Sequence, residues 1–192
     1  MSHEIAERPW EKIGTDLYTI NGQDYLIVVD YFSNFWEIDH LPNTTASTVI
    51  KKLKCHFARQ GIPDIVISDN GPQFACEKFS NFAKEWGFEH RPGSPGHQQT
   101  NGKAEAAVKE AKRLLRKAKD TKGDLYLAVL VHRNTPTESM RTSPAQRLLG
   151  QRCKTQLPTT KELLMPQCVP AETVKRKMQA KQASSVLQQR NA

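Results

Sequence analysis

The chain has 192 residues, enough for one domain of roughly 150 residues and a tail. A net charge of +8 and a pI of about 9.4 favour a polyanionic partner. No apolar run approaches the roughly 18 residues of a membrane span, and the polar N-terminus lacks a signal-peptide pattern, so we expect no membrane association. The four cysteines form no Cys-x-x-Cys pair, which indicates reduced thiols and an intracellular protein.

Three strands are predicted after a polar lead-in. Residues 12–20 alternate imperfectly between apolar and polar, and an Asn-Gly hairpin turn follows them. Residues 23–32 carry a continuous apolar core, as expected of a strand buried on both faces. Residues 34–41 return as a third strand.

Helices and strands alternate in the next part of the chain. Thr44 or Thr45 caps a helix that runs to residue 60, in which apolar residues recur every four positions. Residues 64–68 form a fourth strand and residues 88–91 a short fifth strand. Between them, residues 73–86 form a helix with an aromatic stripe, which we interpret as core packing.

The remainder is predicted to be mostly helical. Residues 92–102 form a mobile loop by composition, and a long basic helix runs from 102 to 119. Shorter helices cover residues 124–134 and 143–150. From Gln151 the chain is rich in Pro, Gln and Lys without a packing stripe, which indicates an extended arm and a weak helix. The predicted organisation is a lead-in (1–11), a core (12–150) and a basic, partly irregular tail (151–192).

The order of these elements predicts an α/β protein. The order matches the ribonuclease H-like fold, which has a five-stranded mixed sheet flanked by helices. It consists of three antiparallel strands, then a helix, a strand, a helix, a strand, and finally helices. In that architecture the first and fourth strands are neighbours, and the long helix crosses near their ends.

Three acidic residues would meet in such a fold. Asp16 lies within the first strand, Asp69 follows the fourth strand, and Glu105 opens the long helix. Two unit charges about 4 Å apart repel by on the order of 4 kcal/mol at an effective dielectric of about 20, so the cluster is sensible only around divalent cations. Taken singly, Asp69 is also a good turn residue and Glu105 a good first-turn residue.

Two further acids compete for these roles. Asp30 also lies at a strand end and could replace Asp16 in the cluster. Asp64 precedes its strand and is interpreted as a cap or a solvated charge.

Basic and polar residues near the acids are candidate contacts for a polyanion. Lys109 and Lys112 share a helix face with Glu105, roughly 6 and 10 Å along the axis, where phosphates would run; the alternative is an exposed basic stripe without a special role. The set of predicted nucleic-acid contacts is Lys109, Lys112, Asn101, Asn70 and Lys103. For Asn70 a turn role is an equal alternative.

Four ordered blocks of sequence resemble a known family. They are RPWEKIGTDLYTINGQDYLIVVDYFSNFWEI, HFARQGIPDIVISDNGPQF, FAKEWGFEHRPGSPGHQQTNGKAEAAVKEAKRLLRKA and RNTPTESMRTSPAQRLLG. Together, over about residues 3–170, they resemble the catalytic core of retroviral and LTR-retrotransposon integrases, most closely those of gypsy-type elements.

The resemblance implies an enzyme and its cofactor. By it, Asp16, Asp69 and Glu105 are the Asp–Asp–Glu triad of an integrase that processes DNA 3′ ends and joins them to target DNA. The triad would hold two Mg²⁺ ions, for which Mn²⁺ can substitute, with Asp16 bridging both ions. The implied partners are element ends, target DNA and further copies of the chain in a homodimer or larger homo-oligomer. A nuclear location is expected, and no small-molecule cofactor.

The chain departs from the family pattern in two ways. The loop reads GSPGHQQTNG, where relatives read close to Ser-Ser-Pro-x-x-Pro-Gln-Ser-Asn-Gly. The family's zinc-binding and small β domains do not appear, which is expected of a core fragment, a truncated element or a domesticated derivative. Two alternatives therefore stand beside the integrase: a catalytically silent DNA-binding or interaction module, and a nuclease that only hydrolyses.

Overall fold

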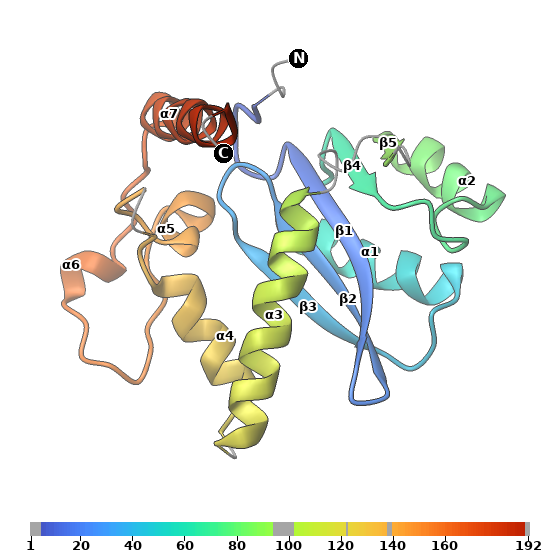
Figure 1. Cartoon of the computed structure of the whole chain (residues 1–192), viewed down its shortest axis with the longest axis horizontal. Coiled ribbons are helices and arrows are strands. Elements are labelled where there is room, and N and C mark those ends of the chain that lie inside the picture. Colours follow the sequence, from blue (N-terminus) through green and yellow to red (C-terminus); the bar gives the residue numbers. More distant parts are fainter. Residues whose placement is uncertain (1–4, 94–101, 122, 138–139, 191–192) are drawn as a thin grey trace.

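The sheet has five strands in the spatial order β3-β2-β1-β4-β5 (Figure 1). The computed structural model describes residues 5–93, 102–121, 123–137 and 140–190. The strands β1, β2 and β3 are antiparallel neighbours, whereas β4 and β5 join in parallel. The predicted mixed five-stranded sheet is therefore confirmed. The strands are β1 Lys12–Ile20, β2 Gln23–Asp30, β3 Trp36–Leu41, β4 Ile65–Ser68 and β5 Glu89–Pro92.

Helices cover both faces of this sheet. Figure 1 shows α3 crossing in front of the strands with α1 behind them. Among the described residues, no helix is long and apolar enough to cross a membrane. The helices are α1 Ala46–Gln60, α2 Glu77–Trp86, α3 Gly102–Asp120, α4 Leu125–Asn134, α5 Pro144–Leu149, α6 Lys161–Leu164 and α7 Ala171–Arg190.

Alternation along β1 and β2 divides the core into two. Successive strand side chains point to opposite faces. Ile13 of β1 joins the cluster that α1 and α2 cover, whereas Tyr18 and Ile20 join the cluster that α3 covers. Asp16 has the same parity as Tyr18 and Ile20, so its side chain starts on the α3 face.

Most predicted element boundaries are close to the observed ones, and α2 is the exception. It begins at Glu77 and not at residue 73, because the carbonyl of Gly71 accepts hydrogen bonds from both Phe74 and Ala75, at 2.9 Å each, in a turn. Cys76 is then extended and serves as the N-cap. The N-cap of α1 is Thr45, one of the two predicted candidates, whose side chain accepts a hydrogen bond from the backbone of Thr48.

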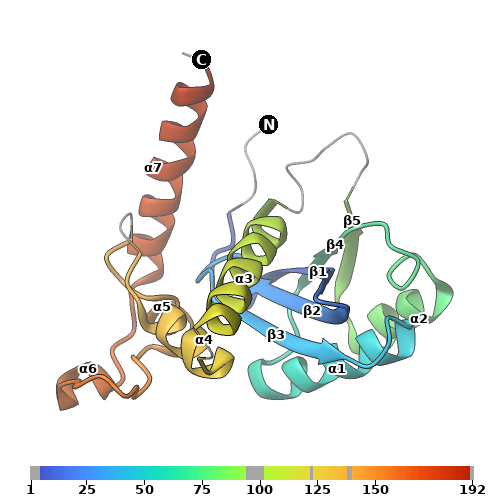
Figure 2. The same cartoon turned by 60° about the horizontal axis from the view of Figure 1, so that its bottom comes forward.

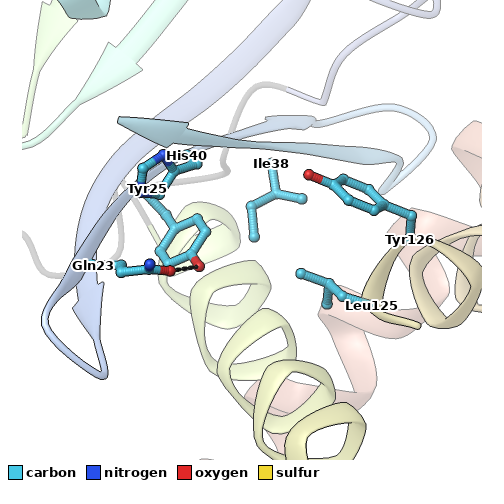
Figure 3. Close-up of a pocket in the computed structure, with 6 residues that line it drawn as sticks. All are labelled: Gln23, Tyr25, Ile38, His40, Leu125 and Tyr126. Atoms are coloured by element: carbon cyan, nitrogen blue, oxygen red, sulfur yellow. Dashed lines mark hydrogen bonds between the residues drawn. The ribbon is translucent and has the colours of Figure 1, made fainter. Parts of the chain in front are cut away.

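The tail is more ordered than its composition indicated. Its long helix α7 packs through Val174, only 1% exposed, into a small cluster with Ala6, Phe32 and Met140. Lys175 also pairs with Glu7 of the lead-in at 2.6 Å. Val174, with the partly buried Met178 one turn later, therefore attaches this helix beside the β2–β3 turn, and Figure 2 shows the rest of α7 extending away from the sheet.

Candidate active site

The sheet register places Asp16 and Asp69 at the same level of neighbouring strands. Strands β1 and β4 are parallel, and their last paired residues are Gly14 and Ile67. Asp16 and Asp69 each lie two residues beyond that pair. Because parallel strands advance together, Asp69 follows the end of β4 at the level where Asp16 lies within β1.

Helix α3 brings the third acid to this position. Small side chains, Ala104, Ala107 and Ala111, face the sheet and allow the helix to lie close to β1 and β2. Glu105 is in the first turn of the helix, next to the fully buried Ala104, and its side chain is exposed. The first turn of α3 thus carries an acid toward the end of the sheet where Asp16 lies.

The three acids interact electrostatically. Burial first, and then the nearby charges of Asp69 and Glu105, raise the pKa of Asp16 from 3.8 to about 6. A backbone hydrogen bond from Leu17 and the charge of Lys112 oppose this shift. The structure therefore brings Asp69 and Glu105 each within electrostatic range of Asp16.

The fit of these residues to a metal ion has two sides. Three carboxylates that repel one another form the oxygen-rich donor set that Mg²⁺ prefers. As the side chains lie, however, the described part of the chain contains no group of three or more His, Cys, Asp or Glu residues placed to hold an ion. Asp69 is exposed and accepts a hydrogen bond from the Gly71 amide at 3.1 Å. The donor set fits a divalent cation, and side-chain rotation would be needed to gather it.

Asp30 does not belong to this group. Its register partner is Ile13, whose side chain joins the opposite core, so Asp30 has the other strand parity from Asp16. Its carboxylate is fully buried and accepts backbone hydrogen bonds from Trp10, Phe32 and Ser33. Asp30 therefore fixes the β2–β3 turn. Asp64 is exposed and pairs with Arg8 at 2.6 Å.

The basic residues of α3 divide into two groups. Lys109 is exposed, and the Lys112 ammonium lies 5.5 Å from the ring centroid of Tyr18 and within electrostatic range of Asp16. Lys103 differs, because it is half-buried and its ammonium donates to the backbone carbonyl of Tyr31. Burial lowers the pKa of Lys103 to about 8, against the influence of Asp30. In this conformation the Lys103 ammonium is bound to Tyr31 and does not extend outward to contact a phosphate.

The predicted contact set includes two asparagines, Asn70 and Asn101, and the structure describes only Asn70. Asn70 is exposed beside Asp69. Asn101 lies outside the described residues. The nucleic-acid contacts of both remain predictions.

One pair of site residues was missed by sequence reasoning. The hydroxyl of Ser68 donates to the Asp69 carbonyl at 2.8 Å and lies 2.9 Å from Nε2 of His90. Since a hydroxyl has one proton, Nε2 of His90 must donate to Ser68. Burial lowers the pKa of His90, which favours this neutral ring. Ser68 and His90 lie far apart in sequence, and their partnership follows only from the β4–β5 pairing.

Solved structures agree with this fold. A chain of the simian T-cell lymphotropic virus intasome in complex with PP2A regulatory subunit B56 gamma superposes with a TM-score of 0.69 at 20% identity, covering 82% of this chain and 60% of that chain. The catalytic core domain of BIV integrase gives 0.63 at 22%, covering 73% and 94%. The fold is ribonuclease H-like, as in retroviral integrase catalytic cores.

Sequence comparison adds the family. Residues 6–98 match the integrase core domain family. An uncharacterized protein of Caenorhabditis elegans is 32% identical over 169 residues, 84% of this chain and 13% of that protein. The Pro-Pol polyprotein of feline foamy virus is 32% identical over 133 residues, 67% of this chain and 11% of that protein. The chain belongs to the integrase core domain family, and spans only about an eighth of the length of these relatives.

Proposed function

We propose that the chain is the catalytic core of a gypsy-type retrotransposon integrase and acts as a metal-dependent polynucleotidyl transferase on DNA. The observation that carries the proposal is the register of β1 and β4, which sets Asp16 beside Asp69, with Glu105 of α3 within electrostatic range of Asp16. Three separate elements bring these carboxylates within electrostatic range, in the family whose members perform this chemistry.

The proposed reaction has two phosphoryl-transfer steps, a hydrolysis and then a transesterification. In the first, water attacks a phosphorus near a DNA 3′ end and the P–O3′ bond breaks. The shortened strand leaves with a free 3′-hydroxyl, and the released piece keeps the phosphate. In the second, that hydroxyl attacks a phosphodiester of target DNA, so that one P–O bond forms as another breaks. No oxidant or nucleotide is consumed.

Asp16, Asp69 and Glu105 would hold the Mg²⁺ ions, with Asp16 shared between them. When bound, these ions activate the attacking oxygen and neutralise charge on the leaving oxygen. Lys109 and Lys112 bind and orient the phosphates along α3, and such contacts give salt-sensitive affinity with little sequence preference. The Ser68 hydroxyl, itself bonded to His90, donates to the backbone carbonyl of Asp69 and so restrains the backbone at Asp69.

The proposed partners follow from this reaction. They are the DNA ends of the element, target DNA and further copies of the chain in a homo-oligomer, and the reaction would take place in the nucleus. The intasome neighbour supports an assembly on DNA.

A branched oligonucleotide tests the proposal. On this substrate strand joining runs in reverse (disintegration) when Mg²⁺ or Mn²⁺ is present. The hypotheses predict products of different lengths. Rejoined strands with both metals, and none with EDTA, are the expected result. Hydrolysed strands without joined products would identify a nuclease that only cleaves.

The second candidate is a DNA-binding module that has lost the reaction. It is favoured by one observation, that the described side chains are not gathered to hold a metal ion. In the same assay it would bind the oligonucleotide and release no product with either metal.

A further inference from the structure

Lys103 is a basic residue of α3 that turns toward the protein. Its Nζ donates to the Tyr31 carbonyl oxygen and lies 5.2 Å from the centroid of the Tyr31 ring. Tyr31 directly follows β2, in the turn that leads to β3. One side chain therefore ties the first turn of α3 to a turn that is 72 residues away in sequence.

The anchor point of Lys103 is held rigidly from several sides. The buried Asp30 carboxylate accepts hydrogen bonds from the amides of Trp10 at 3.0 Å and Ser33 at 2.9 Å. The Ser33 carbonyl in turn accepts a bond from Nε of the buried Arg147 at 2.8 Å. Because these bonds come from the lead-in and from α5, the β2–β3 turn is a fixed point against which a helix end can be held.

Helix geometry links Lys103 to Glu105. Each residue advances about 100° around an α-helix, so Lys103 and Glu105 lie on either side of Ala104, which is fully buried against the sheet. The first turn otherwise offers only Gly102 and the alanines at 104 and 106. Lys103 is therefore the side chain of this turn that can hold its rotation about the helix axis.

Tyr31 interacts with both charged residues. Its carbonyl and ring bind the Lys103 ammonium, and its phenol lies within electrostatic range of Glu105. A rotation of the first turn that released Lys103 would thus also change where Glu105 points.

We propose that Lys103 is a positioning residue for Glu105, whose ammonium fixes the first turn of α3 to the Tyr31 carbonyl and so directs the Glu105 carboxylate toward Asp16. The role of Glu105 rests on the proposed function; the attachment of the helix turn does not. The competing interpretation, that Lys103 binds a DNA phosphate, makes opposite predictions.

Three variants distinguish the two roles of Lys103. Lys103→Met keeps the apolar stem and removes the charge, Lys103→Arg keeps a charged donor, and Lys109→Met removes an exposed charge from the same helix. For each, we would measure kcat for strand joining at saturating DNA, the salt dependence of DNA affinity, and amide hydrogen exchange at residues 106–109. These amides bond to carbonyls of the first turn.

The expected pattern is specific to positioning. Lys103→Met lowers kcat on the order of 100-fold, the cost of a small misplacement, and speeds exchange at residues 106–109. Its salt slope is unchanged, and Lys103→Arg recovers most of kcat. Lys109→Met instead lowers the salt slope by about one.

Two outcomes would overturn the proposal. A salt slope reduced by about one in Lys103→Met, with kcat and exchange unchanged, would make Lys103 a phosphate contact. Unchanged exchange alone would show that Lys103 does not hold the turn. If the wild type joins no DNA, the proposed function fails, while the exchange measurement still decides whether Lys103 holds the turn.

Discussion

The two faces of the sheet differ in the size and chemistry of their side chains. On the α1–α2 face, large aromatic residues pack against one another, with Phe79 contacting Phe74, Phe82 and Phe88. On the α3 face, alanines lie against β1 and β2, and acidic and basic residues stand at the rim. The α1–α2 face thus carries the cluster of phenylalanines, and the α3 face carries the candidate chemistry beside its own apolar cluster.

This division has a physical reason. Large apolar side chains contribute most of the burial energy, and they exclude water and charge from their surroundings. A site of three carboxylates needs access to solvent and cations. It also needs the backbone of α3 to lie close to the sheet, and the small alanine side chains allow this. Mutations on the two faces should therefore separate activity from stability.

The largest expected effect lies on the α3 side. Asp69→Asn should reduce metal-dependent strand joining by about four orders of magnitude, because a charged ligand worth several kcal/mol is lost. Asparagine can still accept the Gly71 amide, so the melting temperature should stay within about 2 °C. Activity is measured on the branched oligonucleotide with Mg²⁺. Wild-type rates in this variant would remove Asp69 from the site.

The opposite face should show the reverse. Phe79→Ala removes a fully buried ring and should lower the free energy of unfolding by about 3–5 kcal/mol. Urea denaturation measures this loss. Strand joining per folded molecule should be unchanged in conditions where the variant remains folded. A loss of activity in the folded fraction would mean that the two faces are coupled.

A smaller effect concerns pH. The pKa of Asp16 is raised from 3.8 to about 6, so between these values the folded protein binds more protons than the unfolded chain. The contribution of Asp16 to stability is therefore full below about pH 4 and is lost as pH rises through 6. Because the side chain is partly exposed, we expect a loss of only about 1 kcal/mol.

Asp16→Asn serves as the control for this pH dependence. In EDTA, the unfolding free energy of the wild type minus that of Asp16→Asn should decrease from pH 4 to pH 7, because only the wild type loses the contribution of Asp16. Mg²⁺ added at pH 7 should raise the melting temperature of the wild type alone. A difference that stays flat with pH would contradict the assigned environment of Asp16.

The smallest effect concerns DNA affinity. Lys109→Ala should weaken binding several-fold and lower the slope of log affinity against log salt by about one. Lys51, exposed on α1, is the matched control on the opposite face, and Lys51→Ala should leave the slope unchanged. Equal changes of the salt slope in both variants would indicate that the overall positive charge attracts DNA, and not a specific set of phosphate contacts along α3.

Local patterns in the sequence were sufficient for the sheet. The hairpin turn after Ile20 and the apolar runs fixed β1 and the start of β2, and the order of elements fixed the fold. The neighbouring positions of Asp16 and Asp69 could be predicted for the same reason, because strand order determines which strands are neighbours. Asp69 and Glu105 both lie within electrostatic range of Asp16, and the joint role of the three acids stays a prediction.

Long-range side-chain contacts could not be predicted. Val174 and Met178 are two apolar residues in a mostly polar helix, too few for a packing stripe, so their docking in the cluster with Phe32 was not expected. Nothing in the sequence distinguishes Lys103 from the other basic residues of α3. Its inward direction depends on the Tyr31 carbonyl, whose position is set by a turn distant in the chain.

The double pairing of β1 has a consequence for its length. Antiparallel β2 bonds one edge of this strand and parallel β4 the other, so β1 cannot slide to absorb an insertion or a deletion. Removing one residue between Ile13 and Asp16 would turn the carboxylate toward the aromatic core. The spacing from Ile13 to Asp16 is therefore constrained as strictly as the identity of the aspartate, and a single-codon frame-preserving deletion there would silence the protein while leaving all three acids in its gene.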